Sequence, residues 1–278
     1  MENIIGIEVP LRAKFIRTIF SEIERIDFHL IWLSFLAKFS FSERIFLKLF
    51  SLHDKINELK YFLSKGVAII NTIGGVRVDI EACDEVFVSL REFERNFSIA
   101  VDFFNSNFFR RLSKGLGFLS REIAEKYGVK GVVGRASCIR EDARKHCDYG
   151  VYGLIEWNVA TCEGGDVFSR TKVLIQEIFE SLKIINQCFN KIEGEKICVT
   201  VKEIPPGEGK GIVESPFGEI RHCVLSDGSN VPKKCEIMDA YENMTPLMKE
   251  IVETRAYEEK MLALSSFYPF FYFYRDEI

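Results

Sequence analysis

Apolar residues recur at steps of three and four near the start of the chain, which predicts one face of a long helix. The helix is expected to begin close to Pro10, because the first turn of a helix tolerates proline. It continues through residues 31–39, where apolar side chains surround the helix axis, so this part should be buried on all sides. The stripe consists of Leu11, Phe15, Ile16, Ile19, Phe20, Ile23, Ile26 and Leu30.

Similar patterns predict further helices, several of them ended by a glycine or begun by a small polar residue. Their expected ranges are 42–65, 84–105, 120–127, 166–191 and 244–264. Gly74 and Gly75 indicate a turn between the second and third of the predicted helices.

After Gly194 the pattern favours strands. Residues 197–201 are one candidate, and 212–214 with 219–225 form a predicted hairpin, because the intervening turn has proline second and glycine fourth. The fold class is therefore mainly α with a small β part.

We expect one domain over 1–278, built as a helical bundle with a β-hairpin region towards its C-terminal end. Its parts are a bundle core at 1–193, a β-rich appendage at 194–235, and a C-terminal helix with an aromatic tail at 236–278.

Composition narrows the class of protein. A chain of 278 residues with 47% hydrophobic residues can bury a sizeable core. Its net charge of −4, without a run of Lys and Arg, argues against nucleic acid as a partner. No signal peptide is recognised at the start, and no apolar run reaches the roughly 18 residues that a spanning helix needs, so the chain is not expected to be transmembrane.

The eight cysteines show no C-x-x-C spacing, so the common zinc and iron–sulfur signatures are absent from the sequence. They are expected to be buried free thiols, because free cysteine is among the most buried residue types.

Residues 131–146 carry the most unusual combination of side chains. Glycines, three arginines and two acids make this stretch too charged for a core and too glycine-rich for a plain helix. Arg135, Asp142 and Arg144 are its candidate functional residues.

This stretch resembles a signature of the large subunits of membrane-bound nickel–iron hydrogenases and of their relative in respiratory complex I, the hydrogenase-like 49 kDa-type or D subunit. In those proteins it reads approximately G-P-x-x-R-A-S-G-x-x-x-D-x-R-K. Other motifs of the family are matched in the same order along the chain, at residues 6–17, 24–33, 73–79, 164–170, 206–219 and 226–228.

The resemblance implies a bundle that docks an iron–sulfur small subunit beside the membrane-arm subunits of a complex. Hydrogenase members hold a nickel–iron centre with two C-x-x-C pairs, because soft thiolates suit these metals. The upstream pair is expected to be missing, since the chain starts shortly before Gly6. Phe270 and Phe273 align with the second pair, so we expect no nickel–iron centre and no cofactor bound by this chain alone, with the iron–sulfur cluster in the partner.

The resemblance to complex I implies that relatives use the same space for quinone, with contacts from an N-terminal part that is expected to be missing here. An acidic residue expected in the first long helix is replaced near Phe39. Both departures weaken a quinone-binding interpretation.

Each candidate site residue has two interpretations. Arg135, Asp142 and Arg144 could line a route towards the iron–sulfur cluster of the partner, where guanidinium groups would raise the reduction potential of the cluster. Alternatively, they form ion pairs that hold the protein together, and we favour this second interpretation. His29 is either a proton carrier or, as we favour, a satisfied core histidine. Cys138 occupies a position at which the family usually has glycine, and is interpreted as a small filler.

The sequence thus indicates a large-subunit-like component of a membrane-associated energy-converting oxidoreductase, peripheral on the cytoplasmic face and not catalytic alone. The alternatives are an active redox subunit, of quinone or hydrogenase type, completed by a separate N-terminal piece, and a non-catalytic assembly or scaffold paralogue.

Overall fold

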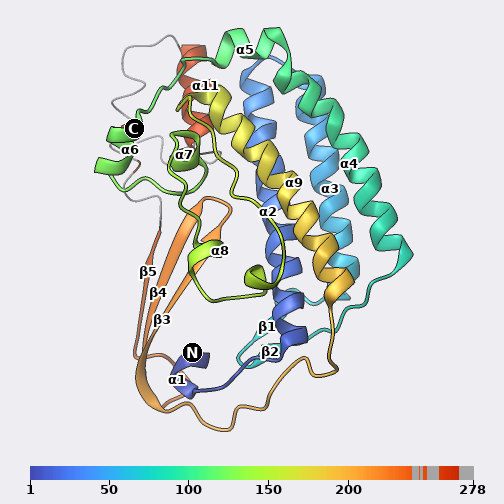
Figure 1. The fold of residues 1–278 in the computed structure, drawn as a ribbon, viewed down its shortest axis with the longest axis vertical. Helices are drawn as coiled ribbons and strands as arrows, with labels where there is room; N and C mark the ends of the chain where they lie inside the picture. The colour runs from blue at the N-terminus through green and yellow to red at the C-terminus, as the bar shows by residue number, and fades with distance from the viewer. Residues whose placement is uncertain (240–243, 245–246, 249–256, 269–278) are drawn as a thin grey trace.

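The fold, taken from a computed structural model, is centred on a bundle of long helices that stand side by side (Figure 1). The structure describes residues 1–239, 244, 247–248 and 257–268. The long helices are α2 (Leu11–Phe39), α3 (Glu43–Ser64), α4 (Asp84–Asn105) and α9 (Val167–Lys191). These four helices confirm the predictions to within a few residues.

Helix α2 lies at the centre of the bundle and packs against α3, α9 and α11 (Tyr257–Phe267). Its apolar stripe is buried as predicted, with the partial exception of Leu11, and one hydrophobic core joins it to the facing sides of α3, α4, α9 and α11. Within 31–39 most side chains are buried or half-buried, and only Lys38 is exposed.

Several short helices connect the long ones, and most of them were not predicted. They are α1 (Glu2–Ile5), α5 (Asn107–Ser113), α6 (Arg121–Lys126), α7 (Gly131–Ala136), α8 (Ala143–His146) and the 3-10 helix η1 (Tyr152–Leu154). Of these only α6 was expected. The prediction that residues 131–146 are too charged for a core and too glycine-rich for a plain helix is wrong for their first six residues, because α7 is helical and every one of its residues is buried.

A three-stranded antiparallel sheet, β3 (Pro206–Ser215), β4 (Gly218–Asp227) and β5 (Lys234–Met238), runs along one side of the bundle (Figure 1). The hairpin is confirmed, with Ser215 paired to Gly218, but β3 begins six residues earlier than the predicted strand at 212 and β5 was not foreseen.

The strand predicted at 197–201 is wrong. Only a single bridge, Gly75 to Cys198, joins this segment to the two-stranded sheet of β1 (Asn71–Thr72) and β2 (Gly75–Val76). The turn predicted at Gly74 and Gly75 is confirmed, since these glycines stand at the bend between β1 and β2.

Gly131 couples α7 to the sheet. Its φ is +66°, and a Cβ placed there would lie 2.0 Å from the carbonyl oxygen of Phe217 in the β3–β4 turn. Only glycine fits this close approach, because any side chain would meet both the contact and a backbone conformation that L-residues disfavour. The turn therefore sets the position of the helix that carries Arg135.

The cysteines follow the prediction only in being free. Cys188 alone is buried, Cys198 and Cys235 are exposed, and the rest are half-buried. Cys138 has φ +67°, in the left-handed region, which gives a physical reason for the glycine that the family usually has at this position.

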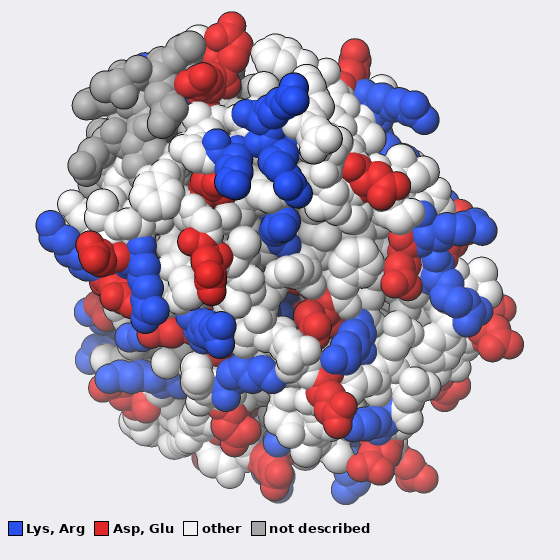
Figure 2. All heavy atoms as spheres, turned by 45° about the horizontal axis from the view of Figure 1, so that its top comes forward, with Lys and Arg blue, Asp and Glu red and all other residues white. Residues whose placement is uncertain are grey.

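The surface carries charges of both signs. In Figure 2, lysines and arginines alternate with aspartates and glutamates over most of this face, apart from one gathering of basic side chains near the top. Of the final helix predicted at 244–264, the structure describes residues 244, 247–248 and 257–264, the last of which belong to α11; Phe270 and Phe273 of the aromatic tail lie outside the described residues.

Candidate functional site

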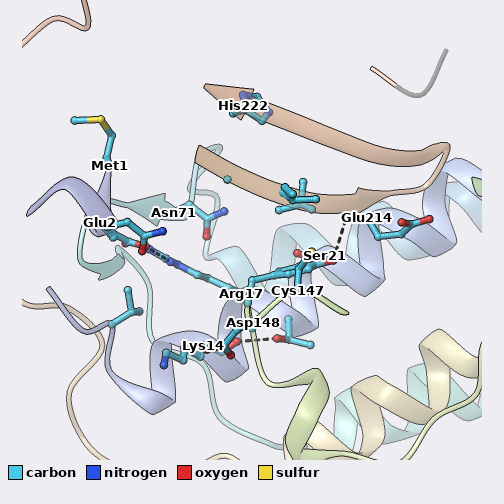
Figure 3. Close-up of a pocket in the computed structure, with 18 of the residues that line it drawn as sticks. Met1, Glu2, Lys14, Arg17, Ser21, Asn71, Cys147, Asp148, Glu214 and His222 are labelled. Carbon is cyan, nitrogen blue, oxygen red and sulfur yellow. Dashed lines mark hydrogen bonds and ion pairs between the residues drawn. The ribbon is translucent and has the colours of Figure 1, made fainter. Parts of the chain in front are cut away.

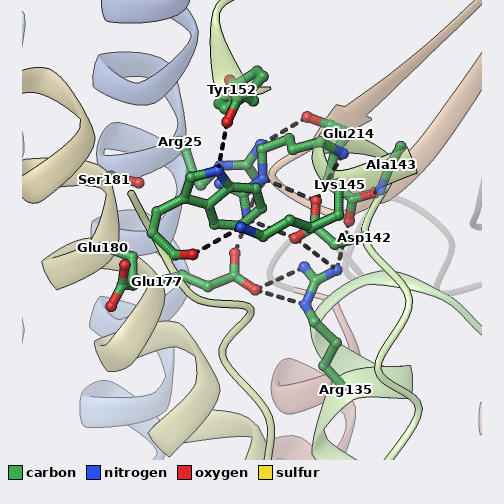
Figure 4. Close-up of polar contacts among 12 residues, drawn as sticks. Arg25, Arg135, Asp142, Ala143, Lys145, Tyr152, Glu177, Glu180, Ser181 and Glu214 are labelled. Atoms are coloured by element: carbon green, nitrogen blue, oxygen red, sulfur yellow. Dashed lines mark hydrogen bonds and ion pairs between the residues drawn. The ribbon is translucent and has the colours of Figure 1, made fainter. Parts of the chain in front are cut away.

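Eight ionisable side chains meet in the interior where α2, α7, α8, α9 and β3 converge. Arg25, Arg135, Asp142, Glu177 and Glu214 of this group are labelled in Figure 4. We call this group the buried charge cluster. None of its members is more than 7% exposed. They are Glu22, Arg25, His29, Arg135, Asp142, Arg144, Glu177 and Glu214.

Helix α2 supplies Glu22, Arg25 and His29, whose spacing places them along one side of the helix. Arg25 lies 3.3 Å from a Glu22 oxygen and donates hydrogen bonds to the backbone carbonyls of Glu214 (2.7 Å) and Ser215 (2.9 Å). A single side chain thus ties the central helix to the end of β3.

Arg135, on α7, is the hub of the cluster. It contacts Glu177 Oε1 through Nε (2.9 Å) and Nη2 (2.7 Å), and its Nη1 donates to Glu214 Oε1 at 2.6 Å (Figure 4). The same Nη1 lies 3.6 Å from Asp142. One guanidinium therefore faces three carboxyl groups, and their charges raise its pKa despite the opposing effect of burial.

Arg144 makes the second set of ion pairs. It binds Asp142 through two hydrogen bonds of 3.0 and 2.7 Å and contacts both oxygens of Glu22 at 3.2 Å, with its guanidinium 4.6 Å from the ring of Trp157. Asp142 also accepts from the backbone N–H of Arg144, so it caps α8. The carboxyl of Asp142 thus both caps α8 and pairs with Arg144, the arginine of this helix.

Among the four carboxyl groups of the cluster, that of Glu22 accepts the most hydrogen bonds from uncharged groups. Tyr152 donates to it at 2.7 Å and Ser181 at 2.6 Å, in addition to its contacts with Arg25 and Arg144. Burial alone would raise the pKa of Glu22, but the two guanidiniums and these hydrogen bonds outweigh it and lower the pKa.

His29 contacts Glu177 through Nε2 at 2.8 Å. Burial lowers the pKa of His29, although Glu177 opposes the shift, so the imidazole is neutral at pH 7 and donates its Nε2–H. Among the described residues nothing is placed to hydrogen-bond Nδ1. His29 is thus a core histidine with one nitrogen satisfied.

The four carboxyl groups differ in their proton affinity. Burial favours the protonated form of each, but guanidinium charges prevail at Glu22, Asp142 and Glu177, whose pKa values are lowered. At Glu214 burial prevails over Arg135, and the nearby charge of Asp142 adds to it, so the pKa of Glu214 is raised.

The structure brings all four predicted site residues, Arg135, Asp142, Arg144 and His29, into this one cluster. Four members were not singled out from the sequence: Glu22, Arg25, Glu177 and Glu214. For two of them the available signal was their position, because Glu22 and Glu177 interrupt the apolar stripes of the helices predicted near 10–39 and at 166–191.

A groove with a volume of about 1150 Å³ lies between the N-terminal half of α2, the loop at 147–150 and the strands β3 and β4 (Figure 3). Its lining is mixed, with Phe28 and Ile212 beside Arg17 and His222. Tyr152 and Glu214 also line it, so the groove reaches the edge of the buried charge cluster.

Within the described residues, no three His, Cys, Asp or Glu side chains are grouped in a way that could hold a metal ion. Phe270 and Phe273 lie outside that part of the chain, and the absence of a nickel–iron centre stays a prediction. Among the described helices, none combines the length and apolar character required to cross a membrane.

The fold and the cluster define a helix-bundle protein whose core is organised around paired charges. The family model of the respiratory-chain NADH dehydrogenase 49 kDa subunit matches residues 67–204. The chain belongs to this family.

Relatives agree along most of the chain. It is 30% identical to the C/D subunit of NADH-quinone oxidoreductase from Hydrogenobaculum sp., over 97% of this chain and 52% of that protein. It is also 30% identical to an H-type subunit of NAD(P)H-quinone oxidoreductase from Gloeobacter violaceus (91% and 73%) and to the D subunit of F(420)H(2) dehydrogenase from Methanosarcina mazei (87% and 68%). The chain therefore spans about half the length of the Hydrogenobaculum relative.

Proposed function

We propose that this chain is the large-subunit-like component of a membrane-associated energy-converting oxidoreductase, where it docks an iron–sulfur small subunit beside membrane-arm subunits. The observation that carries the proposal is its similarity, over about nine-tenths of its length, to subunits of NADH-quinone oxidoreductase, NAD(P)H-quinone oxidoreductase and F(420)H(2) dehydrogenase. The proposed location is the cytoplasmic face of the membrane.

In this proposal residues 1–278 act as a single domain, which the shared hydrophobic core of α2, α3, α4, α9 and α11 supports. The role of Arg135, Asp142 and Arg144 is to hold five segments together. Its support is that each of these three side chains makes at least two ion pairs in the interior.

Isolation of the assembled complex tests the docking role. We expect the tagged chain, extracted from membranes of its native cells in mild detergent, to co-purify with an iron–sulfur protein and with membrane proteins identified by mass spectrometry. Iron is expected in the complex and stoichiometric nickel is not. Recovery of the chain in the soluble fraction without partners would contradict the proposal. Stoichiometric nickel in the complex would favour a hydrogenase-type protein.

The groove supports a second candidate function, in which the chain itself helps to bind a quinone. Its volume exceeds that of typical small-molecule sites, and apolar and polar side chains both line it. The names of the Hydrogenobaculum and Gloeobacter relatives identify those proteins as parts of quinone oxidoreductases.

Filling the groove separates this candidate from a scaffold role. Gly211 lines the groove, and a Cβ placed there meets nothing within 4 Å, so Gly211→Trp should fold while it blocks the space. Gly153→Trp is the control, because Gly153 is exposed, is likewise unobstructed and lies outside the groove. If quinone binds here, quinone reduction by the assembled complex falls at least about tenfold in Gly211→Trp alone, equivalent to about 1.4 kcal/mol. Equal rates in both variants would favour the scaffold.

A further inference from the structure

The buried charge cluster contains four carboxyl groups but only three guanidiniums. The carboxyls belong to Glu22, Asp142, Glu177 and Glu214, and the guanidiniums to Arg25, Arg135 and Arg144. With every one of these groups ionised, one negative charge is left without a cation of its own. An uncompensated charge in a protein interior is strongly unfavourable, and such a site normally takes up a proton instead.

The contacts show which carboxyl is left over. Glu22 contacts two guanidiniums and accepts from two hydroxyl groups. Asp142 has a bidentate pair with Arg144, and Glu177 has two nitrogens of Arg135 besides His29. These three carboxyl groups are therefore compensated.

Glu214 has the poorest set of partners in the cluster. Its Oε1 accepts from one nitrogen of Arg135, a guanidinium already shared with Glu177 and Asp142, and its Oε2 accepts from the neutral backbone N–H of Ala143 at 3.0 Å. Within the described part of the chain, Arg25 contacts Glu214 through its backbone carbonyl and makes no hydrogen bond or ion pair with its carboxyl. The surplus negative charge is thus concentrated at this side chain.

Charged side chains on the neighbouring elements do not compensate the negative charge of Glu214. Glu219 on β4 stands opposite Glu214 in the strand register, but it is itself acidic and takes the contacts of Lys130 (2.9 Å) and Arg221. On the other sides Glu214 faces the cluster residues of α2, α7, α8 and α9. Of these, His29 is disfavoured as the proton acceptor because its burial, with a smaller effect of Arg25 and Arg135, lowers its pKa despite the contact with Glu177.

Glu214 is also the cluster carboxyl residue that borders the groove, with its side chain 2% exposed. It lines the groove together with Tyr149 and Tyr152, and Figure 3 shows it on β3 beside that space. The phenol of Tyr149 accepts a hydrogen bond from the backbone N–H of Glu214 at 2.9 Å, so a second exchangeable group lies beside this residue's backbone. The other cluster carboxyls do not line the groove.

We propose that Glu214 is a proton-binding site, whose carboxyl takes up one proton from water in the groove and so neutralises the buried charge cluster. The raised pKa of Glu214, caused by burial and by the charge of Asp142, agrees with this assignment. The site belongs to the chain itself and does not depend on the proposed place in an oxidoreductase complex.

Infrared spectroscopy of the full-length chain in heavy water tests the proposal. The C=O stretch of a protonated carboxyl is separate from that of a carboxylate, so the spectrum is followed as the pH rises through and beyond the range in which ordinary glutamates ionise. We expect one protonated carboxyl per chain to persist above that range in the natural protein. It should be missing from Glu214→Gln and present in Glu208→Gln, a control on the exposed part of the same strand.

Stability provides a second readout. Because the folded state binds this proton more tightly than the unfolded chain, the natural protein should lose stability relative to Glu214→Gln as pH rises from the ordinary glutamate range, near 4.5, through the folded pKa. The matched Glu208→Gln variant should show no such trend. Urea unfolding at a series of pH values measures it.

Three results would overturn the proposal. The first is an infrared spectrum of the natural protein without a carboxyl that titrates late, which decides the matter even if Glu214→Gln does not fold. The second is a late-titrating carboxyl that survives in Glu214→Gln, since the proton would then lie on another acid. The third is a nitrogen NMR spectrum in which both ring nitrogens of His29 are protonated at pH 7, because His29 would then carry the compensating charge.

Discussion

Arg135→Met is expected to lower the free energy of unfolding by about 3–5 kcal/mol, enough to prevent folding if the protein is only marginally stable. The side chain is fully buried, and its removal leaves Glu177, Glu214 and Asp142 without the cation that they share. Methionine retains much of the volume, so the loss reports the charge rather than a cavity. Urea unfolding followed by circular dichroism measures it.

Two companion variants make this result specific. Arg121→Met removes an exposed arginine paired with Glu125 and should leave the unfolding free energy nearly unchanged. Adding Glu177→Gln to Arg135→Met should recover part of the lost stability, because one of the stranded charges is removed as well. Equal, small losses in Arg135→Met and Arg121→Met would show that the buried charge cluster contributes little to stability.

Trp32→Ala should cost about 3–5 kcal/mol, the usual range for removing a large buried aromatic side chain. Trp32 is fully buried on α2, its indole N–H donates to the carbonyl of Ser265 on α11 at 2.7 Å, and its ring lies 5.7 Å from that of Phe217. The substitution therefore loosens α2 from both α11 and the β3–β4 turn. Thermal or urea unfolding provides the measurement.

Trp32→Phe separates packing from hydrogen bonding. It keeps most of the ring contacts but leaves the Ser265 carbonyl without its donor, for which about 1–3 kcal/mol is expected. Phe62→Ala, on an exposed face of α3, should change little. A loss in Trp32→Ala no larger than that in Phe62→Ala would contradict the central packing role assigned to Trp32.

The helical framework could be predicted because its signal is local. The stripes of α2 and α9 repeat at the helical period over many residues, and Gly66 and Gly128 end helices where glycine usually does. The hairpin turn could also be predicted from the sequence, since Pro216 and Gly218 occupy positions that this type of turn favours.

The failures have in common that they depend on contacts far apart in sequence. The predicted strand at 197–201 lacks a full partner, because the two-residue strand β2 offers it only one bridge. Conversely, the glycine-rich start of β3 is a strand because β4 pairs with it along its whole length. Neither pairing is visible in a local pattern.

Only part of the buried charge cluster could be predicted from the sequence, because many of its contacts join residues far apart in the chain. Arg135, Asp142 and Arg144 were found because they crowd one short stretch of sequence, which also made that stretch look too polar for the interior. Their partners Glu177 and Glu214 lie 42 and 79 residues from Arg135, so only the fold shows that the charges are paired. Paired in this way, Arg135, Asp142 and Arg144 can all be buried.

The wide sequence spacing of the cluster has a consequence for how the chain folds. Arg25 meets the end of β3 across 189 residues, and Arg144 meets Glu22 across 122. Before α2, α7, α8, α9 and β3 have packed together, some of these charged side chains lack their partners. Partly folded states are therefore expected to gain little stability from the ion pairs. Distant contacts of this kind are slow to form. We therefore expect the buried charge cluster to form late in folding, together with the contacts between these elements.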